Sequence, residues 1–177
     1  MNVIFLDFDG VIDTIHGCEK EDVERRIKVL SDICKTYNCK VVVEASSKGF
    51  INEETLEVEG EWLETIFNLF KKYEIECIGR TPSVIKKLGD DTYLPMWKED
   101  EIRLYLFRHP EIDHYCIIDD DDYEDLVKVE DHLVRTLDYS SDPSEEGLLP
   151  KHKEEVGKIL EKDNNIKKLS LKRNKNI

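Results

Sequence analysis

The sequence predicts a three-layer, Rossmann-like α/β fold, in which helices cover both faces of a five-stranded, mainly parallel sheet. Two observations support this fold class. Short apolar runs alternate along the chain with longer amphipathic stretches, which is typical of a parallel sheet with helices on both faces. The chain has 177 residues, of which 40% are hydrophobic, and this is enough to form the core of one domain.

Five apolar runs are the expected strands. They span residues 3–6, 40–43, 75–78, 115–118 and 133–134. Two amphipathic stretches, residues 21–37 and 61–73, place their apolar side chains on one helical stripe. A third helix is expected to begin near Glu99, because three acidic residues there complement the helix dipole. A fourth is expected near Pro150, because proline is favoured in a first helical turn.

Two segments do not fit this alternation. Residues 79–97 contain prolines and glycines without a clear period, so we expect a long loop, which in a compact domain is typically functional or disordered. Residues 138–147 are polar and rich in turn formers, and we expect an exposed connection. We place one folded domain in residues 1–165. Residues 166–177 carry five basic and no acidic residues and are expected to form a basic, flexible tail.

The charge balance excludes one class of function. With 26 Lys and Arg against 40 Asp and Glu, the formal net charge is −14, whereas a protein that coats nucleic acid nonspecifically needs a basic face. The five cysteines form no Cys-x-x-Cys pair, so we expect reduced thiols and no zinc site. No secretory signal pattern follows Met1 and no apolar run reaches 18 residues, so we expect a cytoplasmic protein that does not enter membranes.

Carboxylates follow two of the expected strands. Asp7 and Asp9 come directly after the first strand, and four consecutive aspartates, residues 119–122, follow the fourth. The carboxyl ends of parallel strands meet at one edge of the sheet, where such proteins bind ligands. Taken alone, the first pair can be accidental and the second run a solvated acidic turn, but together they predict a hard-cation site suited to Mg²⁺. Glu44, an acid at the end of the second apolar run, can face this crevice or the solvent.

These residues resemble the motifs of the haloacid dehalogenase (HAD) superfamily of aspartyl-phosphate phosphatases. The segment DFDGVI resembles the first motif and IIDDDD the fourth. Between them this superfamily has a Ser or Thr at the end of the second strand, where the chain offers Ser46, with Ser47 as the alternative. It also has a Lys or Arg ahead of the last acidic strand, where the chain offers Lys98. The resemblance covers most of the chain, and the order of the motifs is more specific than any one of them.

A narrower resemblance is to the capless HAD domain of the Swiss-army-knife RNA repair proteins. The segments IGRTP, WKEDEI, IIDDDD, HLV and EGLL are similar to segments of that group in the same order. The chain departs from the group in two places. It reads EASSK where the group has more hydroxyls and then Trp-Arg, and it has Lys98 where the group favours Arg, which keeps the charge but loses the planar guanidinium.

The resemblance implies a mechanism of phosphate hydrolysis. Asp7 is the implied nucleophile, and Asp9 is the implied general acid and base. Ser46 is implied to hydrogen-bond a phosphoryl oxygen and Lys98 to neutralise charge on it. The implied cofactor is Mg²⁺, with the ligands Asp7, the main-chain carbonyl of Asp9, Asp119 and Asp120. The full set of expected substrate-binding residues is Gly10, Ser46, Ser47, Arg80 and Lys98.

The expected site is open. The segment between Gly10 and the first expected helix is too short for the helical cap that many HAD relatives insert there. An open site admits a phosphate attached to something large, such as a nucleic-acid end or a protein side chain, and the RNA-repair resemblance favours a nucleic-acid 3′-phosphate or a nucleotide. The net charge of −14 opposes a long polyanion, although Mg²⁺ and the basic tail can offset it at short range. Arg80, Lys86 and Lys87 lie near aromatic residues, which suits a phosphate and a stacked base but is equally explained by ordinary loop charges.

Two other classes of function fit parts of this pattern. A receiver domain of a signalling relay also combines acids, Ser or Thr and Lys on a parallel sheet, but it has its acidic pair on the first strand and its phosphoacceptor on the third. That order is the reverse of the present one. A catalytically silent HAD-fold module that binds metal or regulates a partner stays open, although binding a cation does not need Asp9. The sequence leaves the oligomeric state open, and a monomer is compatible with it.

Overall fold

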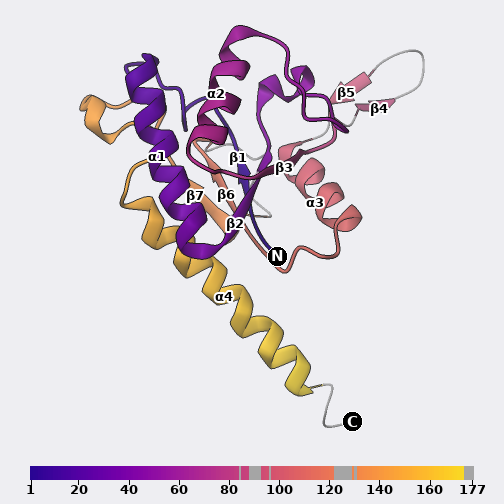
Figure 1. Ribbon diagram of the computed structural model, residues 1–177. Helices are drawn as coiled ribbons and strands as arrows, with labels where there is room; N and C mark the ends of the chain where they lie inside the picture. Colours follow the sequence, from indigo (N-terminus) through magenta and orange to yellow (C-terminus); the bar gives the residue numbers. More distant parts are fainter. Residues whose placement is uncertain (84, 88–92, 96, 122–128, 130, 174–177) are drawn as a thin grey trace.

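The computed structural model describes residues 1–83, 85–87, 93–95, 97–121, 129 and 131–173. Its centre is a sheet of five parallel strands in the order β3-β2-β1-β6-β7 (Figure 1). The strands are β1 (Asn2–Leu6), β2 (Cys39–Val43), β3 (Cys77–Arg80), β6 (His114–Asp119) and β7 (Leu133–Arg135). The predicted fold class is confirmed.

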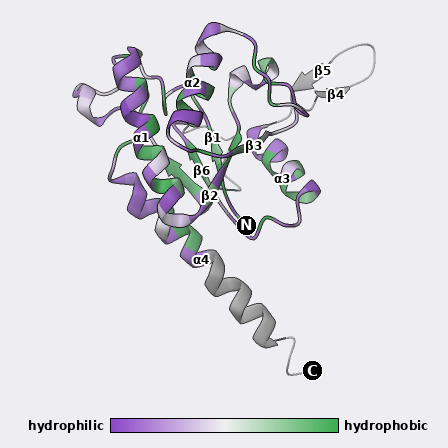
Figure 2. Ribbon diagram, viewed as in Figure 1, coloured by the Kyte–Doolittle hydropathy of each residue, from purple (hydrophilic) through white to green (hydrophobic). Residues whose placement is uncertain are grey.

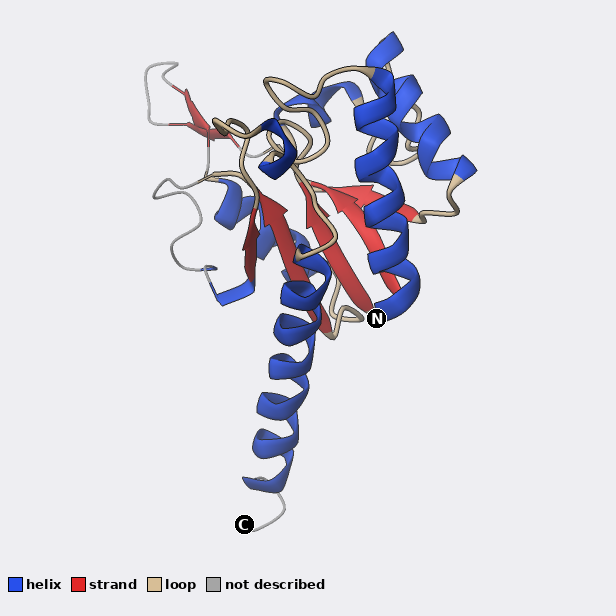
Figure 3. Cartoon of the chain, turned by 90° about the vertical axis from the view of Figure 1, so that its left-hand side faces the viewer, coloured by secondary structure: helices blue, strands red, loops and turns tan. Residues whose placement is uncertain are grey.

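The register of these strands brings three strand ends together. β1 pairs with β2 on one side and with β6 on the other, and Leu6 lies opposite both Val43 and Ile118. The three strands therefore end at the same level, and the acidic residues Asp7, Glu44 and Asp119 lie side by side along one edge of the sheet. Figure 3 shows the strand arrows pointing the same way, toward the loops at this carboxyl edge.

Helices cover both faces of the sheet. α1 (Lys20–Tyr37), α2 (Glu61–Lys72) and α4 (His152–Arg173) lie on one face, and α3 (Lys98–Arg108) lies on the other. Alternate side chains of β1 serve the two layers. Ile4 and Leu6 pack with the three helices, and Val3 and Phe5 pack with α3. Figure 2 shows the hydrophobic residues gathered along the strands and the helix surfaces next to them.

All four predicted helices are present, with starts within two residues of those expected. α1 has Glu21 and Asp22 in its first turn and ends at Asn38, whose φ of 51° is the left-handed conformation that asparagine tolerates. The third strand, expected at 75–78, begins instead at Cys77. After α2, Glu74 adopts a φ of 59° and the N–H of Ile75 donates to the carbonyl of Phe70 at 2.9 Å, so these residues complete the helix end rather than the strand.

Both segments expected as loops contain some regular structure. Residues 79–80 belong to β3, and β4 (Ile85–Lys87) pairs antiparallel with β5 (Tyr93–Pro95), so the expected loop 79–97 is partly strand. Strands of three residues are too short to show a period in a sequence. The connection at 138–147 includes a short 3-10 helix, η3 (Pro143–Glu145), and it is not exposed throughout, because Glu146 is fully buried.

The last helix leaves the body of the domain. α4 packs Val156 and Leu160 into the core and then extends past the amino-terminal edge of the sheet, away from the carboxyl edge (Figures 1 and 3). The segment expected as a tail, residues 166–177, is helical as far as Arg173, and residues 174–177 lie outside the described part of the chain. No helix among the described residues is both long and apolar enough to cross a membrane.

Arg26 of α1 holds the loop that follows β1. Its side chain is 1% exposed, and its guanidinium donates to the carbonyls of Ile12 at 3.1 Å and Gly17 at 2.5 Å. It also donates to Thr14 Oγ1 at 2.9 Å. The whole connection from Asp7 to the start of α1 is this single loop, with no folded cap in it. A buried charge therefore fixes the chain directly after Asp7 and Asp9.

We predict that Arg26→Met lowers the free energy of unfolding by about 3 kcal/mol, because two main-chain carbonyls and a hydroxyl lose a buried donor. Urea unfolding of the wild type and the variant measures the change. Arg25→Met is the matched control: Arg25 is the preceding residue of the same helix, is exposed and pairs with Asp22 at 2.8 Å, so we expect a loss below about 1 kcal/mol. Equal losses in the two variants would contradict the role assigned to Arg26.

Candidate active site

Three carboxylates from two adjacent strands meet at the carboxyl edge of the sheet. Asp7 follows β1 and is 4% exposed, Asp119 ends β6 and is fully buried, and Asp120 is partly buried. One oxygen of each lies within 4.8 Å of the others. Main-chain N–H groups orient two of them: Phe8 donates to Asp7 Oδ1 at 2.7 Å, and Asp121 donates to Asp119 Oδ1 at 2.9 Å. The acids that follow the first and fourth strands of the sheet thus form one cluster.

The ammonium group of Lys98 lies between Asp7 and Asp119. Lys98 is the first residue of α3, and its Nζ donates to Asp7 Oδ2 at 2.6 Å and to Asp119 Oδ2 at 2.9 Å. Burial and the neighbouring Asp119 raise the pKa of Asp7 to about 7, although Lys98 acts in the opposite direction. Burial disfavours the charged form of Lys98, but the two carboxylates outweigh it and raise its pKa. Lys98 is therefore held as a cation against both acids.

The acidic cluster fits a hard divalent cation. Its donors are all carboxylate oxygens, the ligands that Mg²⁺ prefers in proteins. Burial raises the pKa of Asp119 despite Lys98, and burial together with Asp119 raises the pKa of Asp120 to about 6. One ammonium does not offset three converging acids, and a further cation at these oxygens relieves their repulsion. Asp7, Asp119 and Asp120 are the residues that can hold such an ion here.

Asp9 and Gly10 form the turn beside this cluster. Asp9 is exposed, and its Oδ2 accepts a hydrogen bond from Ser46 Oγ at 2.9 Å. Gly10 has a φ of 67°, and a Cβ at this position lies 2.2 Å from Asp120 Cγ, so the close approach of the two acidic loops requires glycine. Thr136 Oγ1 donates to the carbonyl of Gly10 at 2.8 Å and fixes this turn from the β7 side.

Ser47 and Arg80, two further expected substrate-binding residues, differ in their contacts. The Ser47 hydroxyl is buried and has no hydrogen-bond partner among the described residues. Arg80, at the end of β3, donates to the carbonyls of Ile51 at 2.7 Å and Thr81 at 3.0 Å, so its guanidinium is held by the loop beyond Ser47 rather than by the acidic cluster. The side chains of Lys86 and Lys87 lie outside the described residues, and Trp97, directly before Lys98, is 57% exposed.

A second buried cluster of charges, which the sequence did not predict, lies at the ends of β2 and β3. Lys48, in the 3-10 turn η1 (Ser46–Phe50), donates to Glu44 Oε1 at 2.8 Å, to Thr81 Oγ1 at 3.0 Å and to Glu101 of α3. Thr81 Oγ1 also donates to Glu44. Glu44 is 1% exposed, so its solvent-facing alternative is wrong. The only sequence signal was the spacing of Glu44 and Lys48, four residues apart.

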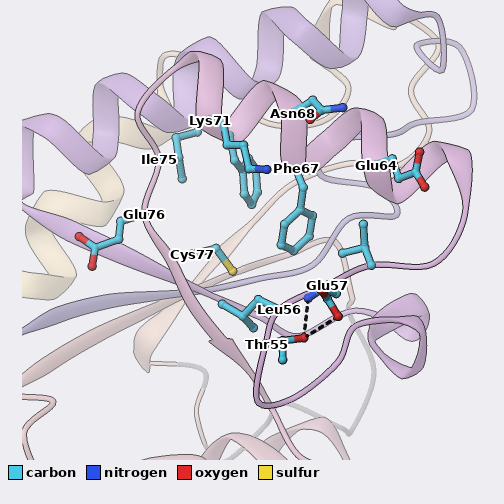
Figure 4. A pocket seen from close by; sticks show the side chains of 12 residues that line it. Thr55, Leu56, Glu57, Glu64, Phe67, Asn68, Lys71, Ile75, Glu76 and Cys77 are labelled. Carbon is cyan, nitrogen blue, oxygen red and sulfur yellow. Dashed lines mark hydrogen bonds between the residues drawn. The ribbon is translucent and has the colours of Figure 1, made fainter.

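Two hollows in the surface differ in chemistry. Figure 4 shows a pocket of about 590 Å³ whose lining comes from α2, residues 55–58 and the start of β3. Phe67 and Lys71 are among its lining residues, and none of its lining residues belongs to the acidic cluster. A hollow of about 380 Å³ lies beside the turn that includes Asp9 and Gly10. Its lining residues are Asp9, Gly10, Asp13, Thr14, Ile15, Cys18 and Asp138. Asp7, Lys98, Asp119 and Asp120 are not among the residues that line this hollow. The candidate site is therefore defined by these four residues, and the hollow borders it at the turn of Asp9 and Gly10.

The parallel sheet with acids at the ends of β1 and β6 is the arrangement of a HAD-type α/β domain. Residues 3–141 match the family model described as "HAD domain in Swiss Army Knife RNA repair proteins", and the chain belongs to this family. No curated protein and no solved structure matches the chain. The family predicted from the sequence is confirmed, and membership of it suggests a phosphatase-type function.

We predict that Glu44→Gln becomes more stable relative to the wild type as the pH rises from about 5 to 8. Burial, more than the repulsion by Glu101, raises the pKa of Glu44 to about 8, even though Lys48 opposes this. The protonated form is therefore favoured in the fold, and its contribution to stability is lost as the pH rises from the ordinary value of 4.5 through 8. Urea unfolding at several pH values measures a relative gain of about 2 to 4 kcal/mol for the variant.

Glu24→Gln is the control for this pH series. Hydrogen bonds from Lys72 and Tyr73 lower the pKa of Glu24 to about 2, so this carboxyl is ionised in both folded and unfolded chains above pH 5. The difference between Glu24→Gln and the wild type should therefore stay constant over the same range. A constant difference for Glu44→Gln as well would show that Glu44 is ionised in the folded protein at neutral pH.

Proposed function

We propose that this protein is a Mg²⁺-dependent phosphomonoester hydrolase that forms an aspartyl phosphate on Asp7. The observation that carries the proposal is the position of Asp7, which is buried at the end of the central strand beside Asp119, with the Lys98 ammonium 2.6 Å from its Oδ2. Membership of a HAD family supports the same reaction class.

The reaction proceeds in two displacements. The ionised Asp7 carboxylate attacks phosphorus, an acyl phosphate bond forms, and the bond from phosphorus to the leaving oxygen breaks. Asp9 gives the leaving oxygen a proton and later takes one from the water that attacks the aspartyl phosphate. This second step releases inorganic phosphate and restores the Asp7 carboxylate. The Ser46 hydroxyl, 2.9 Å from Asp9 Oδ2, holds the Asp9 carboxyl at the site.

The remaining residues bind the phosphate and balance its charge. The proposed Mg²⁺ ligands are Asp7, the main-chain carbonyl of Asp9, Asp119 and Asp120. When bound, Mg²⁺ supplies positive charge against the phosphate oxygens. Lys98 supplies a second positive charge, which strengthens as negative charge builds on those oxygens. The turn at Gly10 and the hydroxyls of Ser46 and Ser47 are the proposed neutral contacts.

The proposed substrate is a phosphorylated nucleotide or nucleic-acid end. A hollow lies beside Asp9 and Gly10, next to the acidic cluster, and the loop after β1 carries no cap that would exclude a large substrate. The RNA-repair description of the family points to the same class. Arg80 is held on the far side of Ser47 and suits a second phosphate or the body of the substrate rather than the reacting group. The same proposal holds that the protein is cytoplasmic and acts as a monomer.

We predict that Asp7→Asn lowers kcat on a chromogenic aryl phosphate by at least about 1000-fold, because an amide cannot form the acyl phosphate. Asp9→Asn should slow turnover by about 100-fold and let the aspartyl phosphate accumulate, detected by intact-protein mass spectrometry. Removal of Mg²⁺ with EDTA should abolish activity in the wild type. Asp32→Asn, in an exposed ion pair with Lys153, is the control that should keep full activity. Steady turnover by pure Asp7→Asn would refute Asp7 as the nucleophile.

We predict that oligonucleotides with a terminal phosphate and mononucleotides are hydrolysed faster than sugar phosphates and phosphopeptides. The physical reason is the exposed ring of Trp97, which directly precedes Lys98 and can stack on a base next to the reacting phosphate. Release of inorganic phosphate from each substrate with Mg²⁺ measures the preference, with 3′- and 5′-phosphorylated oligonucleotides as separate samples. If Mg²⁺ binds and every substrate stays intact, the chain is a catalytically silent metal-binding module.

A further inference from the structure

The ammonium of Lys48 donates hydrogen bonds to acceptors in three separate parts of the fold. Its ammonium has three N–H donors, and these meet Glu44 at the end of β2, Thr81 after β3 and Glu101 in α3. The residue is 8% exposed. The turn that carries Lys48 is itself fixed, because its N–H donates to the carbonyl of Ala45 at 3.0 Å and its carbonyl accepts from Ile51 at 3.0 Å. Lys48 is thus a rigid tie between the sheet and α3.

Glu101, the residue of α3 that Lys48 contacts, lies one helical turn from Lys98. Glu101 follows Lys98 by three residues, and residues three apart are neighbours on the same side of a helix. Lys98 points to Asp7 and Asp119, and Glu101 points to Lys48, so the first turn of α3 is attached to the carboxyl edge by three ion pairs. A shift of this turn moves the ammonium of Lys98 relative to both acids.

Removal of Lys48 takes away a donor that two buried acids share. Glu44 and Glu101 both converge on Lys48 and are both buried. Without the ammonium, Glu44, Thr81 and Glu101 lose the donor that they share, and the contact of β2 with α3 loses the hydrogen bonds that Lys48 makes across it. Lys48 contacts none of the three acids of the candidate site, so any effect it has on the reaction must pass through another residue.

We propose that Lys48 is a positioning residue that, through Glu101, holds Lys98 over Asp7 and Asp119. This inference rests on the function proposed above only where it concerns catalysis, since the position of Lys98 can be measured without turnover. Lys48→Met keeps the length of the stem without the charge, and Lys48→Arg keeps the charge. Lys40→Met is the matched control, because Lys40 lies near the start of β2, whereas Lys48 follows the end of that strand, and Lys40 pairs with Glu76.

The first test is structural and uses hydrogen exchange and crystal structures of the full chain. We expect amide exchange in residues 98–104 to be at least tenfold faster in Lys48→Met than in the wild type, with exchange in α1 unchanged. Lys98 should lie beyond hydrogen-bond distance of Asp7 in Lys48→Met and within it in Lys48→Arg and Lys40→Met. Unchanged exchange and an unmoved Lys98 in Lys48→Met would overturn the proposal. If that variant does not fold, Glu101→Gln weakens the same tie and must show the same shift.

The second test is kinetic, on whichever phosphorylated substrate the wild type hydrolyses. We expect Lys48→Met to lower kcat at least tenfold with less than a threefold change in KM, and Lys48→Arg to restore most of kcat. In a Lys98→Met background the same substitution should cost less than twofold, because the residue it positions is absent. Equal losses in both backgrounds would overturn the proposal. If the wild type hydrolyses no phosphate, the proposed function fails, and the structural test alone decides the role of Lys48.

Discussion

Parallel pairing of β1 with β6 forces two buried carboxylates together, and the rest of the site is arranged around that constraint. Leu6 and Ile118 are register partners, so the residues that follow them, Asp7 and Asp119, leave the sheet as neighbours. Burial raises the pKa of Asp7 to about 7, and repulsion by the neighbouring Asp119 adds to this effect. Only positive charge brought from elsewhere in the chain or from solution makes the arrangement stable, and α3 delivers the first such charge as Lys98.

A further buried acid lies at the end of the neighbouring strand, β2, and it too has a cation beside it. Glu44 follows β2 as Asp7 follows β1, and it is as deeply buried. Here the compensating charge comes from the adjacent turn as Lys48, and Glu101 of α3 shares it. α3 contributes residues of opposite charge to the two clusters: the cation Lys98 to the first and the acid Glu101 to the second. An ion pair at each site ties the start of α3 to the sheet, so the electrostatics of the two strand ends are coupled through one helical turn.

The fold could be predicted from the sequence because each apolar run and each amphipathic stretch is a local pattern. The shift of β3 was not predictable, because it depends on Glu74 and Ile75 completing the end of α2. The placement of Lys98 was predicted only through family resemblance, since a lysine before a helix carries no signal of its own. The cluster of Lys48, Glu44, Thr81 and Glu101 was missed for a different reason. The residues that Lys48 contacts lie up to 53 positions away from it in the sequence, and only the strand order β3-β2-β1 and the packing of α3 bring them together.

The direction of α4 limits how a negatively charged substrate can be attracted. Residues 166–173 of the basic segment belong to the part of α4 that extends past the amino-terminal edge of the sheet, whereas the acidic cluster lies at the opposite edge. The helix rises about 1.5 Å per residue, so Arg173 lies about 20 Å beyond Leu160, the last core residue of α4. Charges are screened over about 8 Å at physiological salt. Residues 166–173 therefore lie too far from the site to offset the net charge of −14 there. Under the proposed function, the phosphate is held by Lys98 and by a cation among Asp7, Asp119 and Asp120. Recognition that is this local favours a terminal phosphate over the middle of a long polyanion.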